Sequence, residues 1–538
     1  MRREVGPNRS YAAPVLVRRV SAIVLTALVV ASCSSDPEVT VTSSRAIDTA
    51  ATTVPSATSG PSATATDASD SSAPSTTEPA EYVPAALDWS DYGDDSDVAL
   101  LDVPVDYADP AGPTFELFVA RHRALDPANR IGSLLVNPGG PGFGGSDFAL
   151  FASQIFDPEL LDHFDIVAWD PRGTGESTPP IDCIDDYDPY FTAIDSTPSN
   201  DAEHQHLVDT AADFTQQCID KNAGILDFVG TNNSARDMDS IRRALGEDTI
   251  SYFGFSYGSE LGATWATLFP DTVRAAVLDG ASDPTADALE SSLQQVAGFE
   301  ASLETFLQRC SETADCAFSH GEDTQQAFVD LLEQLDANPL VVDPDRPPVN
   351  RDVALTAVGK AMYSESYWPS LERSLADAEN GDGAGLMALN DAYYQRQADG
   401  TYGNELEAFQ VISCADQTER PTVEETDAES DQYHAVAPLL VPEGTVGGYF
   451  CTFFPPARDP RVEITGAGAG PIVVIGTTGD PATPLSSTEN MASALEDGRL
   501  VVVEADQHTG YGVNRCIIDV VDNYLIDLTA PDSGTECR

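Results

Sequence analysis

Residues 254–258 are the part of the chain best suited to chemistry, because they place a serine between two glycines in the pattern G-x-S-x-G. A serine hydroxyl is a weak nucleophile at its ordinary pKa and needs a neighbouring base. Where this pattern joins a strand to a helix, the serine lies on a strained turn that lifts its hydroxyl above the edge of a sheet. The flanking residues have strand and helix patterns, so we predict that Ser256 is a nucleophile.

A base and an acid that could activate Ser256 follow it in the chain. Of the seven histidines, His508 follows the last strong strand pattern, in the loop ADQHTGYG. Asp480 ends the preceding strand pattern, where an aspartate can orient the imidazole ring. We prefer Asp480 to Asp506, which is only two residues from the histidine and too close to reach the correct ring nitrogen. The order serine, acid, histidine predicts a triad of Ser256, Asp480 and His508.

Acyl transfer also needs N–H donors for the negative charge that develops on the carbonyl oxygen, and backbone groups serve best because they are fixed. Tyr257, directly after the serine, offers one such donor. The run NPGGPG at residues 137–142 follows an earlier strand pattern, and its glycines let the backbone approach a substrate closely. We predict Gly140 as the second donor, with Gly139 as the alternative.

The elements that must position these residues have the pattern of a parallel α/β sheet. From about residue 81, helical patterns alternate with short apolar runs, at residues 132–140, 164–173, 249–258, 273–280, 471–480 and 500–510. Between about residues 286 and 440, apolar residues recur at helical spacing and continuous buried strands are missing. We therefore predict an α/β fold with a mostly parallel sheet, a core formed by residues 81–285 and 441–538, and a mainly helical lid at 286–440.

The N-terminus has the pattern of an export signal. Five arginines precede an apolar run at residues 20–30, which has signal-peptide length and is short for a membrane span. The sequence VVASC resembles a bacterial lipobox, cut before Cys33, whose sulfur is then lipidated; an ordinary signal cut a few residues away is the alternative. We predict a signal peptide at 1–32, a lipid on Cys33, and a disordered Ser/Thr/Pro-rich tether up to residue 80. The protein is then exported, either anchored on the outer face of the membrane or secreted.

The charge and the cysteines narrow the range of partners. With 88 acidic and 27 basic residues, the net charge of −61 repels nucleic acid and anionic lipids, so membrane contact is expected only through the lipid anchor. Eight cysteines remain besides Cys33, and an even number in an exported protein suggests disulfides. Counting does not fix their connectivity, and pairing of sequence neighbours is the simplest hypothesis: 183–218, 310–316, 414–451 and 516–537. Because no C-x-x-C or H-x-x-x-H pattern occurs, we expect no metal site, and nothing indicates an organic cofactor.

Five motifs in this order resemble one family: NPGGPG, WDPRGTGES, GFSYG, GDPATP and DQHTGYG. Together they resemble the secreted tripeptidyl aminopeptidases, relatives of the prolyl aminopeptidases among the serine peptidases of the α/β-hydrolase superfamily. Asn137 stands where prolyl aminopeptidases usually have histidine, which favours the tripeptidyl branch. The resemblance, over roughly residues 95–285 and 440–538, implies an α/β-hydrolase fold, a triad at Ser256, Asp480 and His508, and release of short peptides, tripeptides first, from a free N-terminus.

An exopeptidase of this kind must recognise the α-ammonium group of its substrate, and a carboxylate on the lid would do so by a charge-assisted hydrogen bond. Glu405, Glu407 and Asp416 are the candidates, with Asp416 preferred because it adjoins an apolar run and Cys414. Two other functions stay open. The same triad would serve a carboxylesterase or lipase, and an envelope lipoprotein with a vestigial triad would bind without catalysis, although the complete triad argues against decay. A halide- or epoxide-processing hydrolase is excluded, because it needs an aspartate at position 256.

Overall fold

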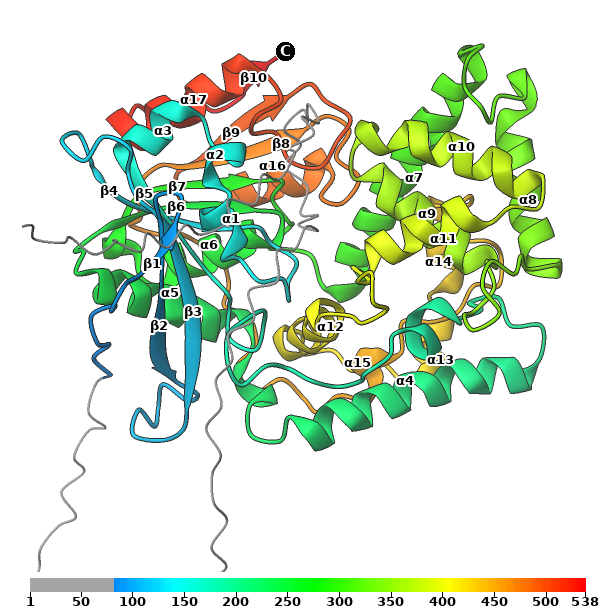
Figure 1. Ribbon diagram of the computed structural model, residues 1–538, viewed down its shortest axis with the longest axis horizontal. Helices are drawn as coiled ribbons and strands as arrows, with labels where there is room; N and C mark the ends of the chain where they lie inside the picture. Colours follow the sequence, from blue (N-terminus) through cyan, green and yellow to red (C-terminus); the bar gives the residue numbers. More distant parts are fainter. Residues whose placement is uncertain (1–81) are drawn as a thin grey trace, which may run out of the picture.

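The computed structural model describes residues 82–538, so the predicted signal peptide, the lipid site Cys33 and the tether lie outside the described residues. A ten-stranded sheet runs through the protein in the order β1-β2-β3-β5-β4-β6-β7-β8-β9-β10 (Figure 1). The strands are β1 (Ser90–Gly93), β2 (Ser96–Pro104), β3 (Thr114–His122), β4 (Gly132–Asn137), β5 (Phe164–Trp169), β6 (Ile250–Phe255), β7 (Val273–Asp279), β8 (Ile472–Thr477), β9 (Gly498–Val503) and β10 (Thr535–Cys537).

Most of the sheet is parallel. The strands from β5 to β10 in the spatial order pair in parallel, whereas β1, β2 and β3 form an antiparallel edge that joins the rest at β3–β5. Strands β5, β6 and β8 are buried along their whole length. Parallel strands covered on both faces read as continuous apolar runs rather than as alternating patterns, which is why the sequence revealed them. The predicted α/β fold is confirmed.

Helices cover both faces of the sheet. Side chains such as Phe253 and Phe255 of β6 face one apolar layer, and Tyr252, one residue before Phe253, faces the other, as expected for side chains that alternate along a strand. The first layer is formed by α1 (Asp147–Leu150), α2 (Ala152–Ile155), α3 (Pro158–His163) and α17 (Arg515–Asp527). The second is formed mainly by α5 (Thr231–Leu245), α6 (Tyr257–Leu268) and α16 (Leu485–Ala494).

A mainly helical region follows β7 and lies beside the sheet, on the right in Figure 1. It has its own apolar core, which includes Leu303, Phe328 and Leu371. Its helices are α7 (Ala288–Glu312), α8 (Thr324–Ala337), α9 (Arg351–Met362), α10 (Trp368–Glu379), α11 (Ala384–Tyr393), α12 (Glu405–Asp416), α13 (Val423–Asp427) and α14 (Ser430–Val436).

Two helices outside residues 286–440 also lie on this side of the molecule. Helix α4 (Asp201–Lys221) precedes the Ser256 strand in the chain, yet it packs against α15 (Phe450–Phe453), which follows the predicted lid. Ring contacts join them, with Phe214 of α4 and Phe450 of α15 at a centroid distance of 5.0 Å. The helical layer is therefore assembled from three separate parts of the chain, and the boundaries at 285/286 and 440/441 stay a prediction.

The predicted pairing of neighbouring cysteines is confirmed at all eight positions. Disulfides join Cys183 to Cys218, Cys310 to Cys316, Cys414 to Cys451 and Cys516 to Cys537. The Cys414–Cys451 bond attaches the end of α12 to α15, and the Cys516–Cys537 bond attaches α17 to β10. Among residues 82–538, none of the helices is both long and apolar enough to cross a membrane.

Candidate active site

Ser256 lies on the turn that joins β6 to α6. Its φ of 55° and ψ of −127° are unusual for a residue with a side chain, and its N–H donates to the carbonyl of Asp279 at 2.8 Å. The flanking glycines are required by space. A Cβ on Gly254 would lie 2.1 Å from the carbonyl oxygen of Gly258, and a Cβ on Gly258 would lie 2.7 Å from that of Asn137. The G-x-S-x-G pattern thus forms a sharp turn that places the serine at the carboxyl end of the sheet.

Asp480 and His508 are hydrogen-bonded to each other, just beyond the carboxyl ends of the neighbouring strands β8 and β9. Nδ1 of His508 lies 2.8 and 3.0 Å from the two carboxylate oxygens of Asp480. The carboxylate also accepts the backbone N–H of Thr483 at 2.9 Å, which holds it in the turn. Asp506, which we set aside, forms an ion pair with Arg309 of α7 instead. The structure therefore brings the preferred acid, and not its neighbour in sequence, to the imidazole.

The second ring nitrogen of His508, Nε2, is not used in the bond to Asp480. Nε2 is buried and has no hydrogen-bond partner within residues 82–538, so it does not bond the Ser256 hydroxyl in this state. Residues 279 and 280 nevertheless adjoin both Ser256 and His508. Ser256 donates its N–H to Asp279, and a Cβ on Gly280 would lie 3.0 Å from Cε1 of His508. Serine–histidine hydrogen bonds are often long without substrate and tighten when it binds.

Asp279 is a residue of this site that the sequence analysis missed. It ends β7 and is fully buried, and its carboxylate accepts the N–H groups of Gly510 and Tyr511, each at 2.7 Å. Its carbonyl accepts the N–H of Ser256. One residue thus anchors both the serine turn and the loop that carries His508. The available signal was an acid at the end of a buried strand, directly before a glycine.

Nearby carboxylates determine the pKa of His508. Burial lowers it, but the negative charge and hydrogen bond of Asp480, with the charge of Asp279, outweigh burial and raise the pKa above its ordinary 6.5. Burial also raises the pKa of Asp279, to about 7, against its two N–H bonds. A general base must be unprotonated, so this environment makes His508 a stronger base that needs a higher pH to be free.

The glycine loop at residues 138–142 packs directly on the serine turn. A Cβ on Gly139 would lie 2.9 Å from Cβ of Ser256 and 3.1 Å from the backbone nitrogen of Tyr257. The N–H of Gly139 donates to the side chain of Asn137 at 2.9 Å, so it is already used. The N–H of Tyr257 is the first of α6 and has no partner within the helix. Between the two glycines that we considered, Gly140 is therefore the better candidate donor.

Helix α12, which carries the three candidate carboxylates, begins at the glycine loop. A Cβ on Gly142 would lie 2.5 Å from the carbonyl oxygen of Glu405 and 2.4 Å from the nitrogen of Phe409. Figure 1 shows α12 between the sheet and the other lid helices. The helix therefore connects the nucleophile region to the lid, with Glu405 at the end near the loop and Asp416 at the far end.

Two of these carboxylates have structural partners. Asp416 accepts the N–H and the hydroxyl of Thr231, at 2.7 and 2.6 Å. Glu407 accepts the N–H groups of Cys183 and Ile184. Burial raises the pKa of each to about 7. In contrast, Oε2 of Glu405 is buried and has no hydrogen-bond partner within the described residues.

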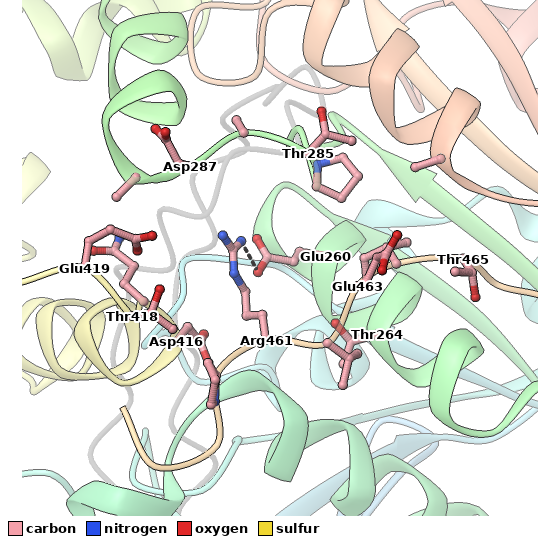
Figure 2. Close-up of a pocket in the computed structure, with 18 residues that line it drawn as sticks. Glu260, Thr264, Thr285, Asp287, Asp416, Thr418, Glu419, Arg461, Glu463 and Thr465 are labelled. Atoms are coloured by element: carbon pink, nitrogen blue, oxygen red, sulfur yellow. Dashed lines mark hydrogen bonds and ion pairs between the residues drawn. The ribbon is translucent and has the colours of Figure 1, made fainter. Parts of the chain in front are cut away.

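Asp416 is one of the residues that line a separate cavity of about 620 Å³ (Figure 2). The cavity is enclosed by α6, residues 284–288, the end of α12 and residues 460–465. An ion pair of 2.6 Å between Arg461 and Glu260 lies within it. None of Ser256, Asp480 and His508 lines this cavity, so Asp416 faces a space apart from the serine turn. One link between Asp416 and that turn runs through Thr231, whose hydroxyl also contacts the hydroxyl of Tyr257.

Comparison with known proteins places this geometry in context. A family model described as the α/β hydrolase fold matches residues 132–514. A "Serine protease Hip1" of Mycobacterium tuberculosis is 35% identical over 467 residues, which cover 81% of this chain and 86% of the relative.

Two further relatives are similar over almost the same length. A "Carboxylesterase B" of Mycobacterium tuberculosis is 35% identical, with 82% of this chain and 86% of the relative covered. A "Tripeptidyl aminopeptidase" of Streptomyces coelicolor is 28% identical, with 84% and 85% covered. All three matches extend across the sheet and the helical lid.

Proposed function

This chain belongs to the α/β-hydrolase fold family. From that premise we propose that it is an exported serine exopeptidase, which removes short peptides, chiefly tripeptides, from the free N-terminus of a polypeptide. The family match and the relatives support a serine hydrolase that has peptidases among its relatives. The peptide substrate, the exopeptidase specificity and the residue roles are the proposal.

One observation carries the proposal: the buried Asp480–His508 pair lies at the same sheet edge as the strained Ser256 turn. In the proposed reaction, Oγ of Ser256 attacks the scissile carbonyl and Nε2 of His508 takes the hydroxyl proton. The N–H groups of Tyr257 and Gly140 stabilise the negative charge on the oxygen. His508 then gives the proton to the leaving amine, and water releases the peptide from the acyl-enzyme by the same steps.

Glu405 is our candidate for binding the substrate ammonium group, in place of Asp416, which we preferred from the sequence. Glu407 and Asp416 already accept hydrogen bonds from the protein, whereas Glu405 has an unpartnered buried oxygen. The backbone carbonyl of Glu405 also adjoins Gly142 of the proposed oxyanion loop, so the start of α12 lies beside that loop. A carboxylate at that place would hold the N-terminus at a fixed distance from Ser256, which limits the length of peptide released.

The proposed location outside the cytoplasm is supported by the four disulfides, which form and persist in oxidising compartments. The anchor on Cys33 and the tether rest on the sequence alone. A lipidated Cys33 would hold the folded part near the outer face of the membrane, with peptides as its substrates.

A carboxylesterase is the second candidate, because a relative of equal identity has that name and the same triad cleaves esters. The two are separated by giving the purified protein one peptide in free and N-acetylated forms, with a simple acyl ester alongside, and identifying products by mass spectrometry. We expect cleavage of the free peptide and loss of cleavage on acetylation. Equal cleavage of both peptides contradicts the exopeptidase, and turnover of the ester alone supports the esterase.

The same assay tests the residue that holds the substrate amine. Glu405→Gln keeps the size of the side chain and removes its charge, so we expect kcat/KM on free peptides to fall by about 10- to 100-fold, the loss typical of one charge-assisted hydrogen bond. Hydrolysis of the acyl ester is the control and should be unchanged. A variant with unaltered peptide kinetics would exclude Glu405.

A further inference from the structure

Three carboxylates lie together between α3 and α17, outside the sites described above. Asp157 precedes α3, Glu159 is in its first turn, and Asp522 is on α17; one carboxylate oxygen of each lies within 4.8 Å of the others. Figure 1 shows α3 and α17 side by side. The sequence could not reveal this cluster, because Asp522 is more than 360 positions from Asp157 and Glu159. The sequence predicts no metal site because it has no C-x-x-C or H-x-x-x-H pattern, and neither pattern detects carboxylate ligands.

Asp522 makes this more than a group of surface acids. Its residue is only 2% exposed. Oδ1 accepts a hydrogen bond from the hydroxyl of Tyr511 at 3.1 Å, whereas Oδ2 is buried and has no hydrogen-bond partner within the described residues. A buried carboxylate oxygen without a hydrogen-bond partner destabilises the fold. Such an oxygen beside two other carboxylates is available to bind a cation.

Arg515 offsets only part of the negative charge of the three carboxylates. Arg515 pairs with Asp157 at 2.5 Å, but its side chain is 57% exposed and it also pairs with Asp519 one turn along α17. Burial, with the charges of Asp157 and Glu159, raises the pKa of Asp522 to about 7, against the Tyr511 hydrogen bond and the charge of Arg515.

We propose that Asp157, Glu159 and Asp522 bind one Ca²⁺ ion between α3 and α17. The donors are all carboxylate oxygens, which hard cations prefer. Ca²⁺ bonds oxygen at about 2.3–2.6 Å, so two of its ligands lie up to about 5 Å apart, which fits the spacing of this cluster. Mg²⁺ bonds are shorter, about 2.0–2.1 Å, and demand a stricter geometry. Water completes the coordination on the exposed side.

The ion has a structural connection to the candidate active site. Tyr511, whose hydroxyl donates to Asp522, also accepts the N–H of Asp157 at 3.2 Å. Tyr511 lies three residues after His508 in the same loop, and its backbone N–H donates to the carboxylate of Asp279. Bound Ca²⁺ therefore fixes the far end of the histidine loop to two surface helices. We expect it to stabilise the fold and to have little effect on the chemical step.

The test uses Tb³⁺ as a luminescent probe on the full-length protein, excited through tyrosine, with Tyr511 as the neighbouring sensitiser. We expect one saturable site from which Ca²⁺ displaces Tb³⁺ more effectively than Mg²⁺. Glu159→Gln, an exposed change, should weaken Ca²⁺ competition at least about tenfold, because the site has few protein ligands. Asp162→Asn is the matched control, since Asp162 is an exposed acid on the same short helix outside the cluster, and it should leave binding unchanged.

Two further variants make the result decisive. Asp522→Asn should abolish the site, and peptide hydrolysis by this variant would verify that it has folded. Arg515→Gln should strengthen binding several-fold, because it removes the competing cation. The proposal is overturned if Ca²⁺ fails to displace Tb³⁺, if Glu159→Gln and Asp162→Asn behave alike, or if Mg²⁺ competes as well as Ca²⁺. In the supporting case, millimolar Ca²⁺ raises the unfolding temperature of wild type and of Asp162→Asn, but not of Glu159→Gln.

Discussion

At the sheet edge and in the helical lid, a buried carboxylate accepts the backbone N–H groups of two consecutive residues, but the consequences differ. At the sheet edge, Asp279 accepts the N–H groups of two consecutive residues, 510 and 511. In the lid, buried Glu300 of α7 accepts those of Leu439 and Leu440, at 2.9 and 3.0 Å, and Glu407 of α12 accepts those of residues 183 and 184. In each case a buried carboxylate fixes a loop. Only at the sheet edge does that loop carry a group proposed to react, so the same bond has a catalytic consequence in one region and a structural one in the other.

Replacement of the nucleophile gives the largest effect that separates the two regions. We predict that Ser256→Ala lowers kcat by at least about 10⁴-fold, as removal of a triad nucleophile does. Its free energy of unfolding should stay within about 1 kcal/mol of wild type, because the hydroxyl makes no structural hydrogen bond in the described residues. Steady-state kinetics and urea unfolding measure the two quantities. Ser291→Ala, an exposed serine of α7, is the lid control and should change neither.

A variant that retained most of its activity would end the assignment of Ser256. A fluorophosphonate probe adds an independent readout, since it should label wild type and Ser291→Ala but not Ser256→Ala. Absence of labelling in wild type would instead favour a binding protein with a vestigial triad.

The sequence was sufficient for the sheet edge because position along a parallel strand fixes position in space. Ser256, Asp480 and His508 each follow a continuous apolar run, and the carboxyl ends of such strands meet at one edge. Asp279 follows the same rule, yet it was missed because an aspartate before glycine also suits an ordinary turn. The sequence pattern of Asp279 followed by glycine was visible, but it fits both a residue of the site and an ordinary turn.

The lid could be predicted as helical, but the roles of its acids could not. On α12, the sequence surroundings favour Asp416, but what separates Glu407 and Asp416 from Glu405 in the structure is contact with residues 185 or more positions away. The same is true of α4, which joins the lid from a part of the chain before the nucleophile. Such contacts are set by packing between distant segments and have no local sequence pattern.

Removal of the carboxylate anchor at the sheet edge should give the next largest effect. We predict that Asp279→Asn lowers kcat by about 10²-fold, or about 2.7 kcal/mol at 1.36 kcal/mol per tenfold, because it loosens the histidine loop. It should also shift the acid limb of the pH–rate profile to lower pH. The sign follows from the raised pKa of His508: removing a nearby negative charge lowers that pKa, so the base becomes free at lower pH.

The matched lid variant is Glu300→Gln, which alters the same kind of anchor on α7. It should lower stability and leave the acid limb of the pH–rate profile where it is in wild type. If both variants shift the limb equally, or neither does, then the anchors do not differ as we argue and Asp279 has no specific role in positioning His508.

Ionisation of the lid carboxylate Glu407 should change the pH dependence of the free energy of unfolding rather than the rate of catalysis. Burial raises the pKa of Glu407 to about 7, so between pH 5 and 7 the folded protein binds more protons than the unfolded chain, and stability falls as pH rises. At 1.36 kcal/mol per pKa unit this carboxyl contributes a loss of about 2 kcal/mol across that range. Glu407→Gln should remove this part of the slope in urea unfolding at the two pH values. Glu489→Gln, exposed on α16, should keep the wild-type slope, and equal slopes in all three proteins would contradict the assignment.

The smallest expected effect distinguishes bonds within the lid from bonds that attach it. Cys414–Cys451 closes a loop with a sequence separation of 37, whereas Cys310–Cys316 closes one of 6. Loop-closure entropy gives about 4 kcal/mol for the longer loop and about 2.4 kcal/mol for the shorter. Double alanine variants of each pair should therefore differ by about 1.5 kcal/mol in free energy of unfolding, with the 414/451 variant the less stable. The 414/451 variant should also lose peptidase activity first on warming, because its disulfide attaches α12, which contacts the glycine loop beside Ser256. A larger loss for the 310/316 variant would mean that the internal packing of the lid, and not its attachment, limits the stability of this region.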